Sequence, residues 1–115
     1  MLKIKRVYEK ADESDGVRIL VDRLWPRGLR KEEAKVDSWL KDVAPSTELR
    51  NLAHHEGAGW EEFKEKYFEE LKGKEATIKE LRQRAKEQTV TLLYAAKDVE
   101  RNNAKALLEF SNLAR

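Results

Sequence analysis

Basic side chains are concentrated in one short stretch of this sequence. The segment RLWPRGLRK, residues 23–31, contains four Arg or Lys residues and no acid, in a chain of 115 residues whose net charge is only +2. The planar guanidinium of arginine donates paired hydrogen bonds that match phosphate and carboxylate groups. We therefore expect Arg23 and Arg27 to bind an anionic small molecule, with the indole of Trp25 as a flat wall of the site.

A second group of charged residues follows an apolar stretch near the end of the chain. VTLLYAA, residues 90–96, leads directly into Lys97 and Asp98, and Asp22 immediately precedes the basic stretch. His54 adds a side chain whose ordinary pKa of about 6.5 suits proton transfer. These residues complete the predicted ligand site, and Asp22, Asp98 or His54 would act as acid or base if it supports a reaction. The sequence does not decide whether the protein is an enzyme.

The apolar pattern indicates the elements that would position these groups. Residues 17–25 and 90–96 are nearly continuous apolar runs, which are typical of parallel strands covered on both faces. The order of elements predicts a single α/β layered domain, residues 1–115, with a largely parallel sheet of about four strands flanked by helices. Further strands are expected at 2–8 and 36–43, and helices at 31–35, 46–55, 60–71, 74–87 and from about 102 onward.

This arrangement predicts where a ligand would bind. In open parallel sheets ligands bind beyond the carboxyl ends of the strands, where the connecting loops diverge. If the strands at 17–25 and 90–96 are neighbours, their charged ends share one crevice. The free N–H groups at the start of the last helix would add further donors for an anion.

Composition excludes several classes of site. The chain has no cysteine, so disulfides, thiolate catalysis and cysteine metal sites are excluded, and a reducing compartment, the cytoplasm, is expected. No apolar run resembles a signal peptide or a membrane span. Adjacent His54 and His55 would point about 100° apart on a helix, so we expect no metal. The sequence also lacks Walker, dinucleotide-binding and serine-elbow motifs, and no cofactor is expected.

Two other functions stay open at this point, as does the oligomeric state. A nucleic-acid-binding module would use the stretch 23–31 together with Lys3, Lys5 and Arg6, with Trp25 stacked on an unpaired base. A domain that acts by binding another protein is the third alternative. The same residues also have purely structural explanations. Arg23 and Arg27 would pair with Asp22 or Asp37, Trp25 and Trp39 would pack in the core, and Asp98 and Ser46 would cap helices.

Four blocks of the sequence resemble the YeaO-like proteins, a family grouped as a domain of unknown function. They are VDRLWPRG, WLKDVAPS followed by LR, GWEEFKEKYFEEL, and LLYAAKD followed by NNA, and together they span nearly the whole chain. The resemblance implies a bacterial or archaeal α/β protein with a site around the end of the second strand and the final strand-helix turn. It implies no established activity. Where the family pattern places His before the paired Asn residues, this chain has Arg101, so no role for that His is transferred.

Overall fold

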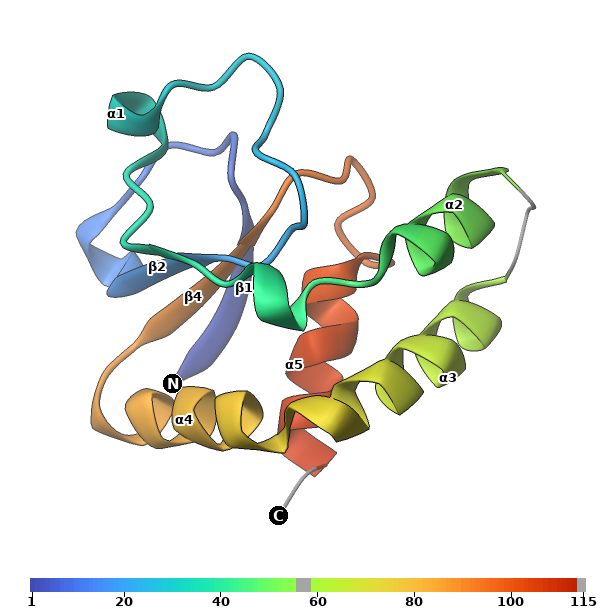
Figure 1. The fold of residues 1–115 in the computed structure, drawn as a ribbon. Helices are drawn as coiled ribbons and strands as arrows, with labels where there is room; N and C mark the ends of the chain where they lie inside the picture. Colours follow the sequence, from blue (N-terminus) through green and yellow to red (C-terminus); the bar gives the residue numbers. More distant parts are fainter. Residues whose placement is uncertain (56–58, 114–115) are drawn as a thin grey trace.

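Four parallel strands form the centre of the molecule. A computed structural model describes residues 1–55 and 59–113, with only the backbone of residues 53–55. The strand order is β1-β4-β2-β3, and all three neighbouring pairs are parallel. This confirms the predicted α/β fold with a four-stranded parallel sheet (Figure 1). The strands are β1 (Leu2–Arg6), β2 (Val17–Leu20), β3 (Ser38–Trp39) and β4 (Val90–Tyr94).

The helices lie mainly on one side of this sheet. Figure 1 shows α3, α4 and α5 grouped together, while the short α1 lies apart from them. No helix in the described ranges combines the length and the apolarity that crossing a bilayer requires. The helices are α1 (Lys31–Ala34), α2 (Thr47–His55), α3 (Trp60–Leu71), α4 (Glu75–Glu87) and α5 (Asn103–Leu113).

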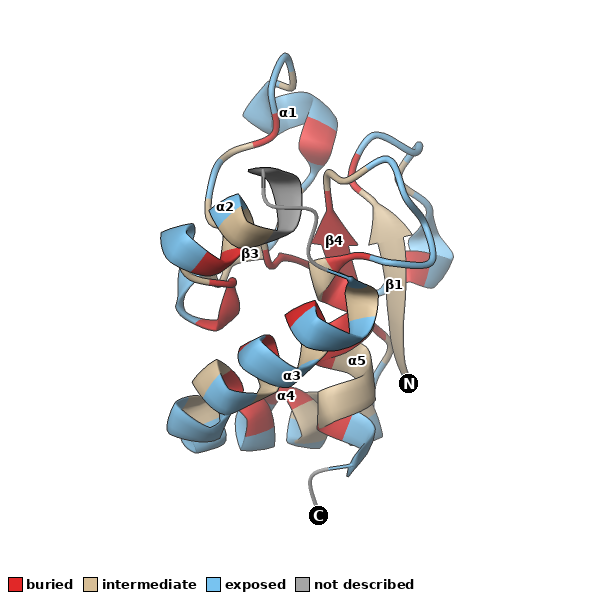
Figure 2. Cartoon of the chain, turned by 90° about the vertical axis from the view of Figure 1, so that its right-hand side faces the viewer, coloured by how far each residue is buried: buried red, intermediate tan, exposed pale blue. Residues whose placement is uncertain are grey.

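Alternate residues of the inner strands pack into two separate cores. Ile19, Val21 and Leu92 face a large core that includes buried residues of α3, α4 and α5. Leu20 and Leu93 face a smaller core on the other side of the sheet, formed with α1 and the loops around it. Both faces are therefore covered, which explains why the two strands are apolar at nearly every position. Figure 2 shows β4 buried, and the outer surfaces of α3 and α4 exposed.

The strand predicted for residues 17–25 is too long. Regular pairing stops at Leu20, and the strand beside it, β4, stops at Tyr94. Just beyond these ends, the backbone N–H of Ala95 donates to the carboxylate of Asp22 at 2.9 Å. A side chain thus takes the place of the next backbone acceptor, and the chain leaves the sheet at Asp22. Residues 23–25 belong to a loop above the sheet edge.

The other predicted bounds differ at the ends of elements. The strand predicted for 36–43 is reduced to two residues, because the chain passes into a short 3₁₀ turn at Lys41–Val43. The strand predicted for 2–8 ends at Arg6, where a turn begins. The predicted order of elements is otherwise observed. The carboxyl ends of β2 and β4 lie earlier in the chain than predicted, at Leu20 and Tyr94, but both are at the same edge of the sheet, as expected.

Candidate functional site

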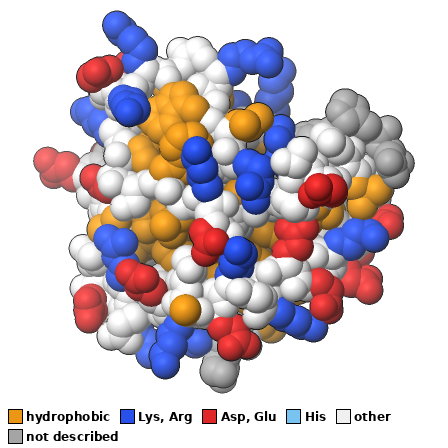
Figure 3. Space-filling view, viewed as in Figure 1, with side chains coloured by type: hydrophobic (Ala, Val, Ile, Leu, Met, Phe, Trp, Pro, Cys, Tyr) orange, Lys and Arg blue, Asp and Glu red, His pale blue; other side chains and the backbone are white. Residues whose placement is uncertain are grey.

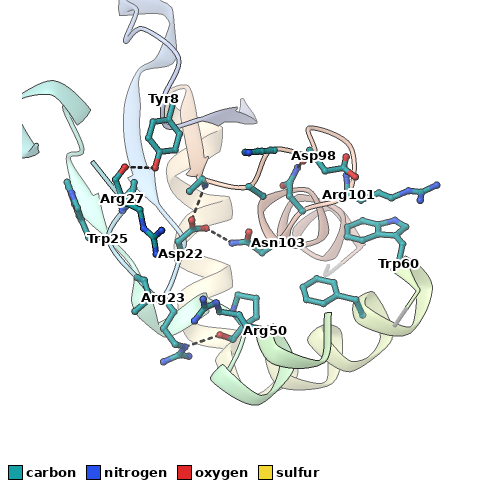
Figure 4. A pocket seen from close by; sticks show the side chains of 18 of the residues that line it. Tyr8, Asp22, Arg23, Trp25, Arg27, Arg50, Trp60, Asp98, Arg101 and Asn103 are labelled. Atoms are coloured by element: carbon teal, nitrogen blue, oxygen red, sulfur yellow. Dashed lines mark hydrogen bonds between the residues drawn. The ribbon is translucent and has the colours of Figure 1, made fainter. Parts of the chain in front are cut away.

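A crevice of ≈ 770 Å³ lies beyond the carboxyl ends of β2 and β4. Its walls come from the loops that follow these strands, from α2, and from the beginnings of α3 and α5 (Figure 4). Six of the seven predicted site residues line it, so the structure brings them together, although their binding of a ligand stays a prediction. These six are Asp22, Arg23, Trp25, Arg27, Lys97 and Asp98.

Asp22 connects several elements at the base of the crevice. Its carboxylate accepts hydrogen bonds from the Ala95 backbone N–H and from the Asn103 side-chain amide, both at 2.9 Å. The backbone carbonyl of Asp22 accepts the indole N–H of Trp39 at 2.7 Å. Both carboxylate oxygens and the carbonyl of Asp22 are therefore used to join the end of β2 to β3, β4 and α5. Figure 4 shows the carboxylate of Asp22 directed at the side chain of Asn103.

Burial changes the acidity of this carboxylate. Removal from water raises the pKa of Asp22 above its usual 3.8, although the bonds from Asn103 and Ala95 and the charge of Arg50 act in the opposite direction. The side chain is thus more easily protonated than an exposed aspartate. Its two donor partners hold it in one position in the wall.

Arg23 has a structural role. Its guanidinium donates to the carbonyls of Pro45 at 2.9 Å and of Ala44 at 3.3 Å. The ion pair with Asp22 or Asp37 that the sequence left open is not formed among the described residues. The Asp37 carboxylate instead accepts the backbone N–H of Arg18 at 2.8 Å. Arg23 therefore fixes the chain ahead of α2 while its side chain still lines the crevice.

Four other basic side chains line the same space. Within the described ranges, no carboxylate lies within ion-pairing distance of any of them. Figure 3 shows Lys and Arg side chains gathered in the upper part of one face, around the loop that follows β2. In Figure 4, Arg27 points toward Asp22, whereas Arg101 points outward. The four are Arg27, Arg50, Lys97 and Arg101.

Trp25 serves mainly in packing. Its ring meets that of Trp39 edge to face, with centroids 5.4 Å apart, and its indole N–H donates to the Leu29 carbonyl at 2.6 Å. It is half-buried against the smaller core while also lining the crevice. The packing that the sequence left open for Trp25 and Trp39 is observed, and the donor of Trp25 is already used.

The turn before α5 uses its own polar side chains. Asp98 accepts the backbone N–H groups of Glu100 at 2.9 Å and Arg101 at 3.0 Å, and these bonds lower the pKa of its carboxyl. The Asn102 side chain accepts the backbone N–H of Lys105 at 2.8 Å. Of the N–H groups at the start of the last helix that the sequence offered to an anion, that of Lys105 is therefore already bonded. The helix-capping role predicted for Asp98 is wrong, because its partners precede α5 and Asn102 caps that helix instead.

The remaining predicted residue, His54, belongs to α2. Its side chain lies outside the described residues, so the structure does not place it relative to the crevice. The described part of the chain contains no group of three or more side chains suited to hold a metal ion.

Sequence reasoning missed several residues of the crevice. Arg50 was seen only as part of a family block, although it lies one helical turn after the Ser46 cap. Trp60 and Phe63 were assigned to the core side of their helix, yet both also line the crevice. Tyr8 follows the first strand, and its hydroxyl donates to the Arg27 carbonyl at 2.8 Å. A Trp that opens a helix directly after glycine was the available signal for an exposed aromatic wall.

Comparison with known proteins places the chain in a family. A model of the family described as "Inactive DUF488-N3 subclade" matches residues 1–114. Uncharacterized protein YeaO of Escherichia coli (strain K12) is 47% identical over 109 residues, 95% of each chain. Uncharacterized protein Rv3073c of Mycobacterium tuberculosis (strain ATCC 25618 / H37Rv) is 43% identical over 111 residues, 96% of this chain and 93% of the relative. No solved structure shows a significant match. The chain therefore belongs to the YeaO-like family of uncharacterised proteins, which the matching model describes as the inactive DUF488-N3 subclade.

Proposed function

We propose that the crevice binds a small molecule that carries a phosphate or carboxylate group. The observation behind this proposal is the charge of the described lining, which contains five basic side chains and only two carboxylates. The carboxylates, Asp22 and Asp98, are occupied by hydrogen bonds from the protein itself. A partly enclosed space with excess positive charge attracts anions and strengthens their hydrogen bonds relative to those on an open surface.

The same contacts favour binding over catalysis. A general base needs an oxygen directed at the ligand, but Asp22 directs both of its oxygens at Ala95 and Asn103. The lowered pKa of Asp98 makes it a weak base. The description of the matching family as inactive agrees with this interpretation. We therefore expect a binding protein, acting in the cytoplasm as its cysteine-free sequence suggests.

The contacts of other basic residues favour a small ligand over a nucleic-acid strand. A strand needs a broad basic face with several free cations. Lys5 is paired with Asp15 at 3.1 Å, and Arg30 is paired with Glu33 at 3.3 Å. The Arg6 guanidinium donates to the carbonyls that follow β4. Lys3 and Lys31 form no ion pair among the described residues, but the larger group of unpaired cations, Arg27, Arg50, Lys97 and Arg101, lies around the crevice, which is a compact site.

Calorimetric titration with inorganic phosphate, pyrophosphate and citrate tests this function. We expect at least one of these anions to bind, and Arg27→Ala to weaken it about tenfold or more, since a hydrogen bond to a charged group contributes about 1.5–3 kcal/mol. Arg30→Ala is the matched control, because Arg30 is exposed and paired with Glu33 outside the crevice. The affinity of Arg30→Ala for the anion should equal that of the unmodified protein.

The contrary results are equally specific. If none of the anions binds, the crevice has no such function. If Arg27→Ala and Arg30→Ala weaken binding alike, the ligand lies on an outer basic surface. Binding of single-stranded oligonucleotides with a steep dependence on salt would then favour the nucleic-acid alternative.

A further inference from the structure

We propose that the ligand of the crevice is a mononucleotide, with its phosphate held by Arg27 and Arg50 and its base packed against Trp60. This inference deepens the proposed function and depends on it. It adds a planar ring to the anionic group, and it assigns that ring to a part of the crevice that the anion does not use.

The crevice has two walls of different chemistry. The loop after β2 and the helix α2 contribute Arg23, Arg27 and Arg50, while the start of α3 contributes Trp60 and Phe63. Figure 4 shows Arg23, Arg27 and Arg50 on one side and Trp60 on the other, with Arg101 beside Trp60. An inorganic anion would contact only the first wall. A ligand that matches both walls needs a negative group at one end and a flat apolar group at the other.

The aromatic wall is held in position by the core. Trp60 and Phe63 are stacked, with ring centroids 5.9 Å apart and planes inclined by 14°. Phe63 is buried and also contacts the ring of Tyr67, at 5.7 Å. Trp60 is only half-buried and lines the crevice, so part of its indole is open to a ligand. A ring that is fixed before binding loses little conformational entropy when a base packs on it.

The arginine wall suits a phosphate. Arg27 is exposed. Arg50 lies close enough to Asp22, at the base of the crevice, for its positive charge to act on the pKa of that carboxylate. Arginine is the preferred partner of phosphate because its donors match two phosphate oxygens at once. The volume of ≈ 770 Å³ falls within the usual range of about 300–1,000 Å³ for small-molecule sites. A mononucleotide fits such a space.

Titration of the full chain with AMP, UMP, ribose 5-phosphate and adenosine tests the inference. AMP or UMP should bind about fivefold or more tightly than ribose 5-phosphate, which is the lower end of what a stacked base contributes. Adenosine, which has no phosphate, should bind more weakly than AMP. Trp60→Leu should remove the advantage of the nucleotide and leave the affinity for ribose 5-phosphate unchanged. Phe68→Leu should preserve that advantage, because Phe68 lies on the same helix but packs against Phe110, outside the crevice.

A second measurement uses the unmodified protein, so its result does not depend on whether a variant folds. In an NMR titration of the unmodified protein, the indole N–H signal of Trp60 should shift with AMP and stay in place with ribose 5-phosphate. If AMP and ribose 5-phosphate bind equally and this signal does not respond, the nucleotide inference is wrong while the anion site stands. If adenosine binds as tightly as AMP, the phosphate assignment is wrong. If no phosphate compound binds, both proposals fail.

Discussion

Asp22 shows how a residue that looks catalytic can be architectural. Its position after an apolar strand, beside arginines, predicted an acid or base at the ligand site. In the structure its carboxylate accepts one hydrogen bond from the Ala95 backbone and one from Asn103, 81 residues away along the chain. Burial raises its pKa, and Arg50 opposes this change. We interpret Asp22 as the residue that holds the loop after β2 in place, so that Arg27 faces the crevice.

Replacing this residue tests its structural role. Asp22→Asn substitutes an NH₂ group for one of two oxygens, so either the Ala95 N–H or the Asn103 amide loses its acceptor. We expect the free energy of unfolding to fall by about 1–3 kcal/mol, the usual consequence of a buried donor left without a partner. Chemical denaturation measures it. The exposed Glu32→Gln should change stability by less than about 0.5 kcal/mol. Equal stability of the two variants would contradict this role.

The position of α2 relative to α3 decides which side chains face each other across the crevice. Ser46 caps α2, with its hydroxyl oxygen accepting the Leu49 N–H at 3.1 Å, as the sequence indicated. The Ser46 hydroxyl and backbone N–H also donate to the carboxylate of Glu70 on α3. One serine therefore starts one helix and attaches it to the next. These bonds help to set Arg50 on α2 opposite Trp60 on α3.

Loss of the Ser46 hydroxyl should remove the cap of α2 and also the hydrogen bond that this hydroxyl makes with Glu70. Ser46→Ala should lower the free energy of unfolding by about 0.5–2 kcal/mol, the range for a lost helix cap. Thr47→Ala, at the exposed neighbouring position, is the matched control and should have a smaller effect. In a double-mutant cycle, Ser46→Ala and Glu70→Gln should be non-additive, because the two side chains contact each other. Additive effects would show that Glu70 does not hold α2.

At the scale of the whole molecule, a buried ionic cluster joins three of the four strands of the sheet to α1. The buried carboxylate of Asp15 pairs with Lys5 of β1 at 3.1 Å and with Arg18 of β2 at 2.5 Å. Its backbone carbonyl accepts the hydroxyl of Thr91 in β4 at 2.6 Å. The Arg18 guanidinium continues to the carbonyl of Ala34 in α1 at 2.8 Å. One polar cluster thus connects three strands and a helix, away from the crevice.

This cluster should dominate the response of the fold to acid. Burial acts to raise the pKa of Asp15, but the bonds from the Asp12 N–H, Lys5 and Arg18 lower it overall, below 3.8. A lowered pKa in the folded state means that Asp15 adds stability above pH 3.8, which is lost as the pH falls below that value. Asp15→Asn should therefore be less stable by about 3–5 kcal/mol at pH 7, as for a broken buried ion pair. The difference in the free energy of unfolding between this variant and the unmodified protein should become smaller as the pH falls below 3.8.

Denaturation curves at pH 7 and at pH values below 3.8 measure both effects. Asp42→Asn is the control, because Asp42 pairs with Lys74 at the surface, where a pair is worth about 0–1 kcal/mol. A difference between Asp15→Asn and the unmodified protein that stays constant with pH would contradict the assigned pKa.

The sequence by itself determined the fold class, the order of elements and the edge of the sheet at which the crevice lies. Burial on two faces favours apolar residues at nearly every position of a strand, so the two inner strands, predicted at 17–25 and 90–96, were recognisable from their residues alone, although not their carboxyl ends. Parallel strands end at one edge, which brought Arg27 and Lys97 to the same side of the molecule. The cap at Ser46 was equally local, because it depends on residues within one helical turn.

Only the tertiary structure decided what each side chain of the crevice does there and which further residues, such as Arg50 and Trp60, line it. The bond between Asp22 and Asn103 joins residues separated by 81 positions, and no local pattern predicts it. Likewise, Arg50 and Trp60 meet across the crevice because of how α2 and α3 pack, while their own spacing shows only two amphipathic helices. Propensity and periodicity act within one element, whereas the chemistry of this site depends on the packing between elements.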